Sequence, residues 1–214
     1  MTSPRLVKGG LVQLDPASGR TLRVIALQYN PDTLTRSLQL QGTGAEGGDR
    51  SQALRLRGAA VETLKVEAEI DATDRLEQPD QNATTVERGL HPQIAALELL
   101  VQPSSEALQA NDALSRSGVL EVLPIQQPLT LFVWGSNRVV PVRVTDLSIT
   151  EEAFDTRLNP IRVKVSLGLR VLSVDDLGFD HRGGTLFMGH LRSRESMATQ
   201  AGTTALSALG LEAI

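Results

Sequence analysis

The sequence predicts a mainly β fold of the α+β class, with a long antiparallel hairpin at its centre. The first observation is a strict alternation of apolar and polar residues over 159–172, which is the period of a strand with one buried and one solvated face. The second is a run over 139–150 of similar character. The third is a series of shorter β-prone runs, interrupted by a helical insert at about 86–115. We therefore expect a sheet built around the hairpin.

The run 159–172 carries one apolar set on a single face. At about 3.3 Å per residue this strand measures roughly 40 Å, so it needs a long partner. We expect residues 151–160 to connect it to that partner. In the partner the alternation slips between Val144 and Leu147, which predicts a β-bulge near Thr145-Asp146. The apolar set comprises Ile161, Val163, Val165, Leu167, Leu169 and Val171.

The N-terminal half predicts further strands separated by polar loops. The run 21–29 is apolar on both of its faces, so we expect both faces to be covered. Glycine-rich residues 42–53 and polar residues 74–85 lack the periodicity of any element and predict loops, the first of them mobile. The predicted strands of this half are 5–14, 21–29, 34–40 and 64–71.

The helical insert begins after Val86. Pro92 suits a first helical position, apolar residues recur at helical spacing up to Pro103, and 104–114 predicts a second helix. Strands then resume at 119–123 and 128–134. A turn at Gly135-Ser136-Asn137 leads into the long hairpin.

The periodicity stops after Val174. Residues 175–178 predict a short cap or turn, and Gly183-Gly184 a hinge. The remainder has weak helical spacing and cannot make its own core, so we expect it to lie on a neighbouring subunit or to be disordered alone. The chain thus divides into a β domain, 1–178, and a C-terminal arm, 179–214, extended or helical. Deleting 183–214 is expected to leave the β domain folded and to impair assembly.

Composition narrows the function. The 214 residues suffice for a large core, and the absence of cysteine excludes disulfides and thiolate chemistry. A net charge of −4 with mixed signs gives no basic footprint for nucleic acid. No apolar run approaches the ~18–20 residues of a membrane span, and the N-terminus lacks the apolar core of a signal peptide. We expect assembly in the cytoplasm without direct membrane insertion.

Residues that chemistry would need are scarce. The carboxylate pairs Glu67/Glu69 and Glu151/Glu152 fall on predicted solvated surfaces, not in an apolar cleft. His91, His181 and His190 lack the spacing of a zinc helix. The acidic loop that carries Asp74, Glu77 and Asp80 lacks the calcium-loop pattern, so a solvated loop is the better interpretation.

The residues therefore favour a non-enzyme suited to assembly over an enzyme, and we expect no catalytic residue, cofactor or metal. Trp134 and Tyr29 flank apolar strands, so we expect both to be core anchors and not ligand-stacking residues. With only 3% aromatic residues, a sugar-binding face is disfavoured.

Three motifs in order resemble the N-terminal tube domain of contractile injection system proteins. They are Gln28-Tyr29-Asn30-Pro31 followed by Leu34, then Phe132-Val133-Trp134-Gly135-Ser136, then 144–150 leading through Phe154-Asp155 to 160–167. The similarity covers about residues 5–174. The family-motif residues are Tyr29, Asn30, Pro31, Phe132, Trp134, Gly135, Phe154, Pro160, Val163 and Val165.

The resemblance implies a tail-tube-like β-barrel or sandwich with a flanking helix. It further implies a homo-oligomeric ring, expected to be a hexamer, that acts as a tube initiator between the spike or baseplate hub and the inner tube. The partners would be the spike protein, the inner tube and other baseplate subunits, within a phage-tail-like particle that is cytoplasmic or released.

One departure from the family concerns the C-terminus. Members often carry a LysM module after the tube domain, and residues 179–214 do not resemble it. Two other function classes stay open: a monomeric β-sandwich module that binds a saccharide or peptide, and a hydrolase with an unusual carboxylate pair. Self-association separates the ring from both.

Overall fold

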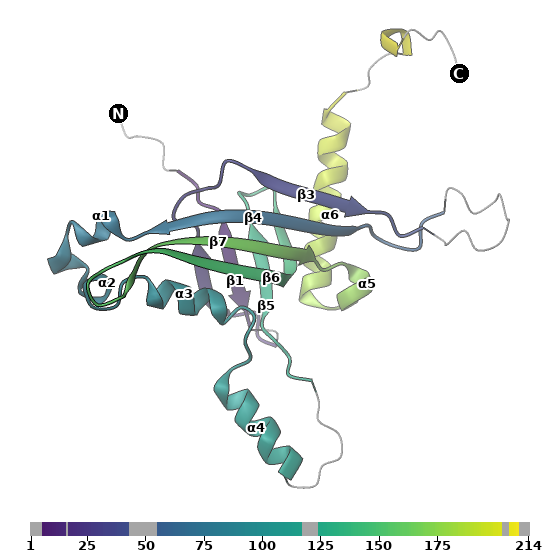
Figure 1. Cartoon of the computed structure of the whole chain (residues 1–214). Coiled ribbons are helices and arrows are strands. Elements are labelled where there is room, and N and C mark those ends of the chain that lie inside the picture. The colour runs from purple at the N-terminus through teal and green to yellow at the C-terminus, as the bar shows by residue number, and fades with distance from the viewer. Residues whose placement is uncertain (1–5, 16, 43–54, 117–123, 203–205, 210–214) are drawn as a thin grey trace.

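The computed structural model describes residues 6–15, 17–42, 55–116, 124–202 and 206–209. These residues form a seven-stranded antiparallel sheet in the order β2-β1-β5-β6-β7-β4-β3, with flanking helices (Figure 1). The mainly β prediction is confirmed. The strands are β1 Gly10–Leu14, β2 Thr21–Ala26, β3 Leu34–Gln39, β4 Val61–Asp71, β5 Leu129–Val133, β6 Val139–Phe154 and β7 Pro160–Val171.

The predicted central hairpin is β6 and β7, and both are long. Their register shifts between Val144 and Asp146, which confirms the predicted bulge. A further shift between Glu151 and Ala153 lets β6 continue to Phe154, beyond the strand end that the alternation predicts. A bulge interrupts the alternation without ending the pairing, so the pattern alone places the end too early.

Strand β2 differs from the prediction. Val24 is 63% and Leu22 45% exposed, so the expectation that both faces of 21–29 are covered is wrong. The reason is the place of β2 at the edge of the sheet, where β1 is its one strand neighbour among the described residues. Apolar residues on both faces of this strand therefore leave an apolar surface in solvent.

Helix α3, His91–Glu98, begins beside Pro92 as predicted and packs on the inner face of the sheet through Ile94 and Leu97. Helix α4, Ser105–Arg116, is also predicted; it stands away from the sheet in Figure 1 and buries none of its described side chains. Residues 74–85 are not a plain loop, because hydrogen-bonded turns fold them into short helices. These are α1 Thr73–Leu76, the 3-10 helix η2 Pro79–Gln81 and α2 Ala83–Arg88.

The C-terminal segment packs on its own chain. Helix α5, Val174–Leu177, starts with a capping box between Ser173 and Asp176. Helix α6, Arg182–Gln200, buries Phe187 in the main core. The expectation that this segment lies on a neighbouring subunit or is disordered alone is therefore wrong for the first half of α6. A short 3-10 helix, η3, follows at Leu206–Leu209.

The glycines Gly183 and Gly184 lie in the first turn of α6 and do not form a hinge. A Cβ on Gly184 would clash with the carbonyl oxygen of Gly178, so this close approach requires glycine.

Two predictions fall on residues outside the described part of the chain. The glycine-rich loop at 42–53 lies there except for Gly42, and so does the strand at 119–123. Within the described helices, none is long and apolar enough to cross a membrane.

The main core joins the inner faces of both halves of the sheet to α3 and α6. In Figure 1 strands β1 and β5 cross behind β4, β7 and β6. Leu11 of β1 and Phe132 of β5 belong to the same core cluster as the buried side chains of β4, β7 and β6. Val163 is fully buried there and Val165 is 3% exposed. Alternation in β7 thus turns the opposite, polar face of this strand toward solvent.

Candidate assembly surfaces

The two edge strands are the first candidate surface. Strands β2 and β3 end the strand order on opposite sides, and each pairs with a single strand among the described residues. Both expose apolar side chains: on β3, Leu38 is 49% exposed, and Leu40 just after it is 73% exposed. An unpaired edge with apolar side chains is a template for another strand. These edges are suited to pairing with other chains.

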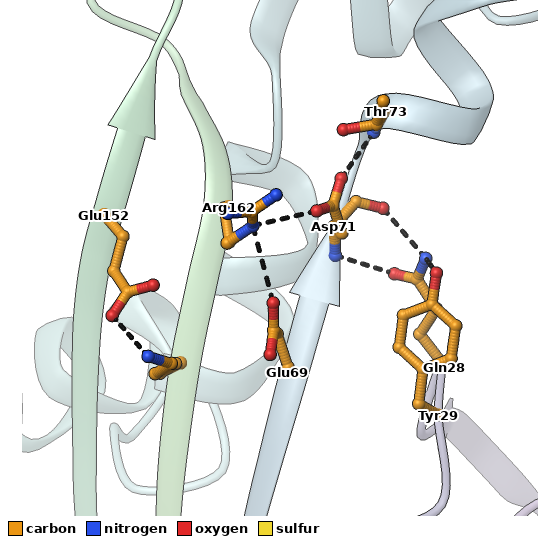
Figure 2. Close-up of polar contacts among 8 residues, drawn as sticks. Gln28, Tyr29, Glu69, Asp71, Thr73, Glu152 and Arg162 are labelled. Carbon is orange, nitrogen blue, oxygen red and sulfur yellow. Dashed lines mark hydrogen bonds and ion pairs between the residues drawn. The ribbon is translucent and has the colours of Figure 1, made fainter.

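The outer face of β4, β7 and β6 is a ladder of opposite charges (Figure 2). Arg162 Nε lies 2.9 Å from Asp71 Oδ2 and 3.4 Å from Glu69 Oε1. Lys164 Nζ lies 2.7 Å from Glu152 Oε1. Opposite charges on neighbouring strands stabilise the pairing modestly and fix its register.

These contacts shift the ionisation of the ladder. Hydrogen bonds from the side chain and backbone of Thr73, with a further one from Arg162, hold the pKa of Asp71 below its ordinary value. The hydrogen bond to Asp71 raises the pKa of Arg162, and the one to Glu152 raises the pKa of Lys164. Each of these three shifts favours the charged form of its group.

Gln28 forms two hydrogen bonds to the backbone of Asp71 at the end of β4, as Figure 2 shows. Its Nε2 donates to the carbonyl oxygen of Asp71 at 2.8 Å, and its Oε1 accepts from the N–H of Asp71 at 3.0 Å. The amide thus replaces a strand residue and joins the segment after β2 to the end of β4. Tyr29, beside it, is 49% exposed and its hydroxyl accepts from Gln28 Nε2, so the prediction of a core anchor is wrong for Tyr29.

The first two motifs meet at the N-terminal segment. Asn30 Oδ1 accepts from the N–H of Gly9, and its Nδ2 donates to the carbonyl oxygen of Val7, both at 2.8 Å. The ring of Trp134 packs on Gly9, where a Cβ would lie 2.5 Å from Trp134 Cε3. Asn30 and Trp134, distant in sequence, therefore hold the same short segment.

Trp134 is half-buried and packs against the core, as predicted. Its ring stacks on that of Phe132, with centroids 5.8 Å apart and planes 17° apart. Gly135 follows with φ 69°, a conformation that favours glycine in the turn to β6. Pro31, after Asn30, is half-buried at the turn into β3.

The third motif divides between the core and the hairpin tip. Val163 and Val165 belong to the core. Pro160 is buried and pairs with Phe154 across the hairpin, whereas Phe154 is 49% exposed. Exposed apolar residues at this tip could not be foreseen from alternation, which assigns faces but not their coverage.

Three of the other polar residues named in the sequence analysis, Glu69, Glu152 and His181, make structural contacts. Glu69 and Glu152 form ion pairs on the outer face. His181 Nδ1 accepts from the N–H of Gly183 and caps α6. His190 is buried and its Nε2 has no hydrogen-bond partner in the described structure. No group of three or more His, Cys, Asp or Glu side chains positioned to hold a metal occurs in the described ranges.

A buried ion pair at Glu62 was not predicted from the sequence. Its side chain is 5% exposed, 2.8 Å from Arg194 of α6 and 3.5 Å from Arg36 of β3. Glu62 stands on the inner face of β4, where alternation expects an apolar residue, and that departure is the one signal that could have revealed the pair.

No protein-family model and no curated protein matches this sequence. Among solved structures, the chain is similar to a chain of the virion of a native gene transfer agent particle, with 8% identity and a TM-score of 0.28. It is also similar to a chain of the tail of an empty gene transfer agent particle with C6 symmetry, with 10% identity and a TM-score of 0.29. Each similarity covers 76% of this chain and 90% of the other.

Proposed function

We propose that this chain is a non-catalytic structural subunit of a phage-tail-like contractile injection system. Its copies form a ring, a hexamer, that connects the spike or baseplate hub to the inner tube. The observation that carries the proposal concerns the two edge strands of one sheet: β2 and β3 each pair with a single strand among the described residues, and both expose apolar side chains. The ordered tube-domain motifs in the sequence support it further.

The edges favour a ring for a geometric reason. Because β2 and β3 are different surfaces, pairing β3 of one copy with β2 of the next is a head-to-tail contact, which closes into a ring when the rotation allows. Closure removes the free edges and buries Leu22, Val24 and Leu38. The charged outer face then presents a polar surface to a water-filled channel.

The test combines mass with shape. Light scattering and particle imaging are expected to show a six-fold ring, or incorporation into a tube-bearing particle when the spike and tube proteins are present. Leu22→Lys with Val24→Lys should leave the subunit folded, since both side chains are exposed, and should prevent ring closure by placing charges on the edge. Asn137→Lys, in an exposed turn, is the matched control and should assemble normally.

One observation favours the alternative of a monomeric ligand-binding module. A cavity of about 370 Å³ lies between β2, β4, β7 and α3, with Lys8 and Arg75 beside an apolar lining of Val24, Ala68, Leu97 and Leu167. A subunit that stays monomeric, never joins a particle and binds a ligand in this cavity would support the module and contradict the ring.

A further inference from the structure

Leu158 has an unusual conformation at the tip of the β6–β7 hairpin. Its φ is 64°, the left-handed region, and no other non-glycine residue described in the chain has a positive φ. This conformation disfavours a leucine, and glycine, asparagine or aspartate are the residues that adopt it readily. The Leu158 side chain is also 76% exposed, so packing within the described chain does not account for a leucine here.

The loop that presents Leu158 is held in place by Asp155. One carboxylate oxygen accepts from the N–H groups of Arg157 and Asn159, at 2.7 and 2.8 Å, and the other accepts from Asn159 Nδ2 at 2.9 Å. The N–H of Leu158 donates to the carbonyl oxygen of Asp155 at 3.0 Å. The strained conformation is therefore built into the loop, because these bonds fix the residues on both sides of Leu158.

The tip is also anchored to α2. Asn159 Nδ2 donates to the carbonyl oxygen of Glu87 at 3.1 Å, and Arg157 donates to that of Val86. A rigid loop that exposes a leucine, with Phe154 49% exposed at its base, loses little conformational entropy on binding. Strain at an exposed, well-supported residue points to a contact with another molecule.

A matching surface exists elsewhere on the same chain. An apolar groove of about 650 Å³ lies between α3 and β6, lined by Leu99, Val101, Leu147, Ile149 and Glu98 among others. Leu99 is 44% and Val101 39% exposed. Glu98 is the charged residue of the lining and forms no ion pair with the described residues. Arg157, next to Leu158, lies with its Nε 3.8 Å from Asp155 Oδ2 of the same loop and is still 57% exposed. The exposed guanidinium of Arg157 is complementary to the carboxylate of Glu98.

A chain cannot place its own tip in its own groove. From Ile149 to Phe154 strand β6 runs away from the groove by roughly 17 Å at the usual rise per residue. The bonds to α2 hold the tip at that end of the molecule. A Leu158 tip seated in this groove therefore belongs to a different copy.

We propose that the Leu158 tip of one copy inserts into the Leu99–Val101–Ile149 groove of a second copy, with Arg157 facing Glu98. The contact is head-to-tail, since tip and groove are different surfaces. It rests on the proposed self-association and adds to it the residues of a second contact, separate from the strand edges.

The test uses the absence of cysteine in the natural chain. Leu158→Cys protein is mixed with Val101→Cys protein that carries a mass tag, in the presence of oxidised glutathione, which accepts the two electrons and two protons of disulfide formation. Non-reducing gels are expected to show the mixed dimer. Leu6→Cys, used in place of Leu158→Cys, is the matched control, because Leu6 is 72% exposed and lies far from the hairpin in sequence. Its yield of mixed dimer with Val101→Cys should be several-fold lower.

A second variant separates docking from folding. Leu158→Gly suits a φ of 64°, so its thermal midpoint should equal or exceed that of the natural protein. Losing a leucine buried at the contact should nevertheless weaken self-association by about tenfold or more. A residue with a merely structural role would lower the thermal midpoint instead.

The outcomes distinguish this contact from the ring. If the natural protein assembles while Leu158→Gly assembles equally well and the mixed dimer does not exceed its control, the tip contact is wrong and the ring stands. If the natural protein is monomeric at every concentration and joins no particle, the ring falls and the tip contact falls with it.

Discussion

Glu62 and Arg194 join the start of β4 to the second half of α6. Arg194 Nη2 donates to both oxygens of the Glu62 carboxylate, at 2.9 and 2.8 Å, across 132 positions of sequence. The Glu62 side chain is 5% exposed. A carboxylate at this depth requires a cation, so the ion pair fixes where α6 lies on the sheet.

Arg194→Ala is expected to lower the free energy of unfolding by about 2–3 kcal/mol, because Glu62 stays buried with Arg36 as its remaining cation. For a chain of this size the midpoint of thermal unfolding should fall by roughly 5–10 °C. Arg192→Ala, on the exposed side of the same helix, is the control and should shift the midpoint little. Equal effects of the two variants would show that Glu62 does not need this partner.

His190 should make the stability of the protein depend on pH near neutrality. Burial, and then the charge of Arg194, lower the pKa of His190 from its ordinary value of 6.5, with Arg138 and Arg36 adding to and Glu62 opposing the shift. The unfolded chain therefore binds a proton at His190 at a higher pH than the folded one does. The contribution of neutral His190 to the free energy of unfolding is fully present above pH 6.5, and it is lost as the pH drops toward the folded-state pKa.

The measurement is the thermal midpoint from pH 7.5 to pH 5. His190→Gln should flatten the dependence over this range, since glutamine does not titrate. His91→Gln, at an exposed position, should keep the natural slope. An unchanged slope in His190→Gln would assign the pH dependence to other groups.

Substituting alanine for Gly9 and for Gly189 should change the free energy of unfolding in opposite directions. A Cβ on Gly9 would lie 2.5 Å from the ring of Trp134, so Gly9→Ala should destabilise the fold by about 1–3 kcal/mol through overpacking. Gly189 lies exposed within α6 with open space around it, so Gly189→Ala should stabilise by about 0.5–1 kcal/mol. Urea unfolding of both variants measures the difference. A tolerated Gly9→Ala would mean that Trp134 does not depend on this packing.

The two halves of the C-terminal segment should differ in their importance for folding. Removing 183–214 deletes Phe187 from the core and should give an unfolded or aggregated chain, contrary to the expectation from sequence. Removing 201–214 keeps α6 and should preserve the far-ultraviolet circular dichroism and a cooperative thermal transition. A folded product from the longer deletion would restore the interpretation of this segment as a separate arm.

Local patterns predicted several elements well. The alternation in 159–172, the slip near Asp146 and the position of Pro92 each depend on neighbours within a few residues, and each element formed where predicted. The burial of Val163 and Val165 follows from the same alternation. Of the motif residues, Trp134 took its predicted place and Tyr29 did not.

Which side chains are covered by other elements, in contrast, was decided by the tertiary structure. Whether Val24 is buried depends on which strand lies beyond β2, and whether Phe187 joins a core depends on where α6 docks; neither is encoded in local periodicity. The pairing of Glu62 with Arg194 and the left-handed Leu158 likewise arise from distant contacts and loop hydrogen bonds. The sequence by itself determined the strands and their faces, because side-chain alternation is local. The tertiary structure decided which faces meet, because burial depends on long-range pairing.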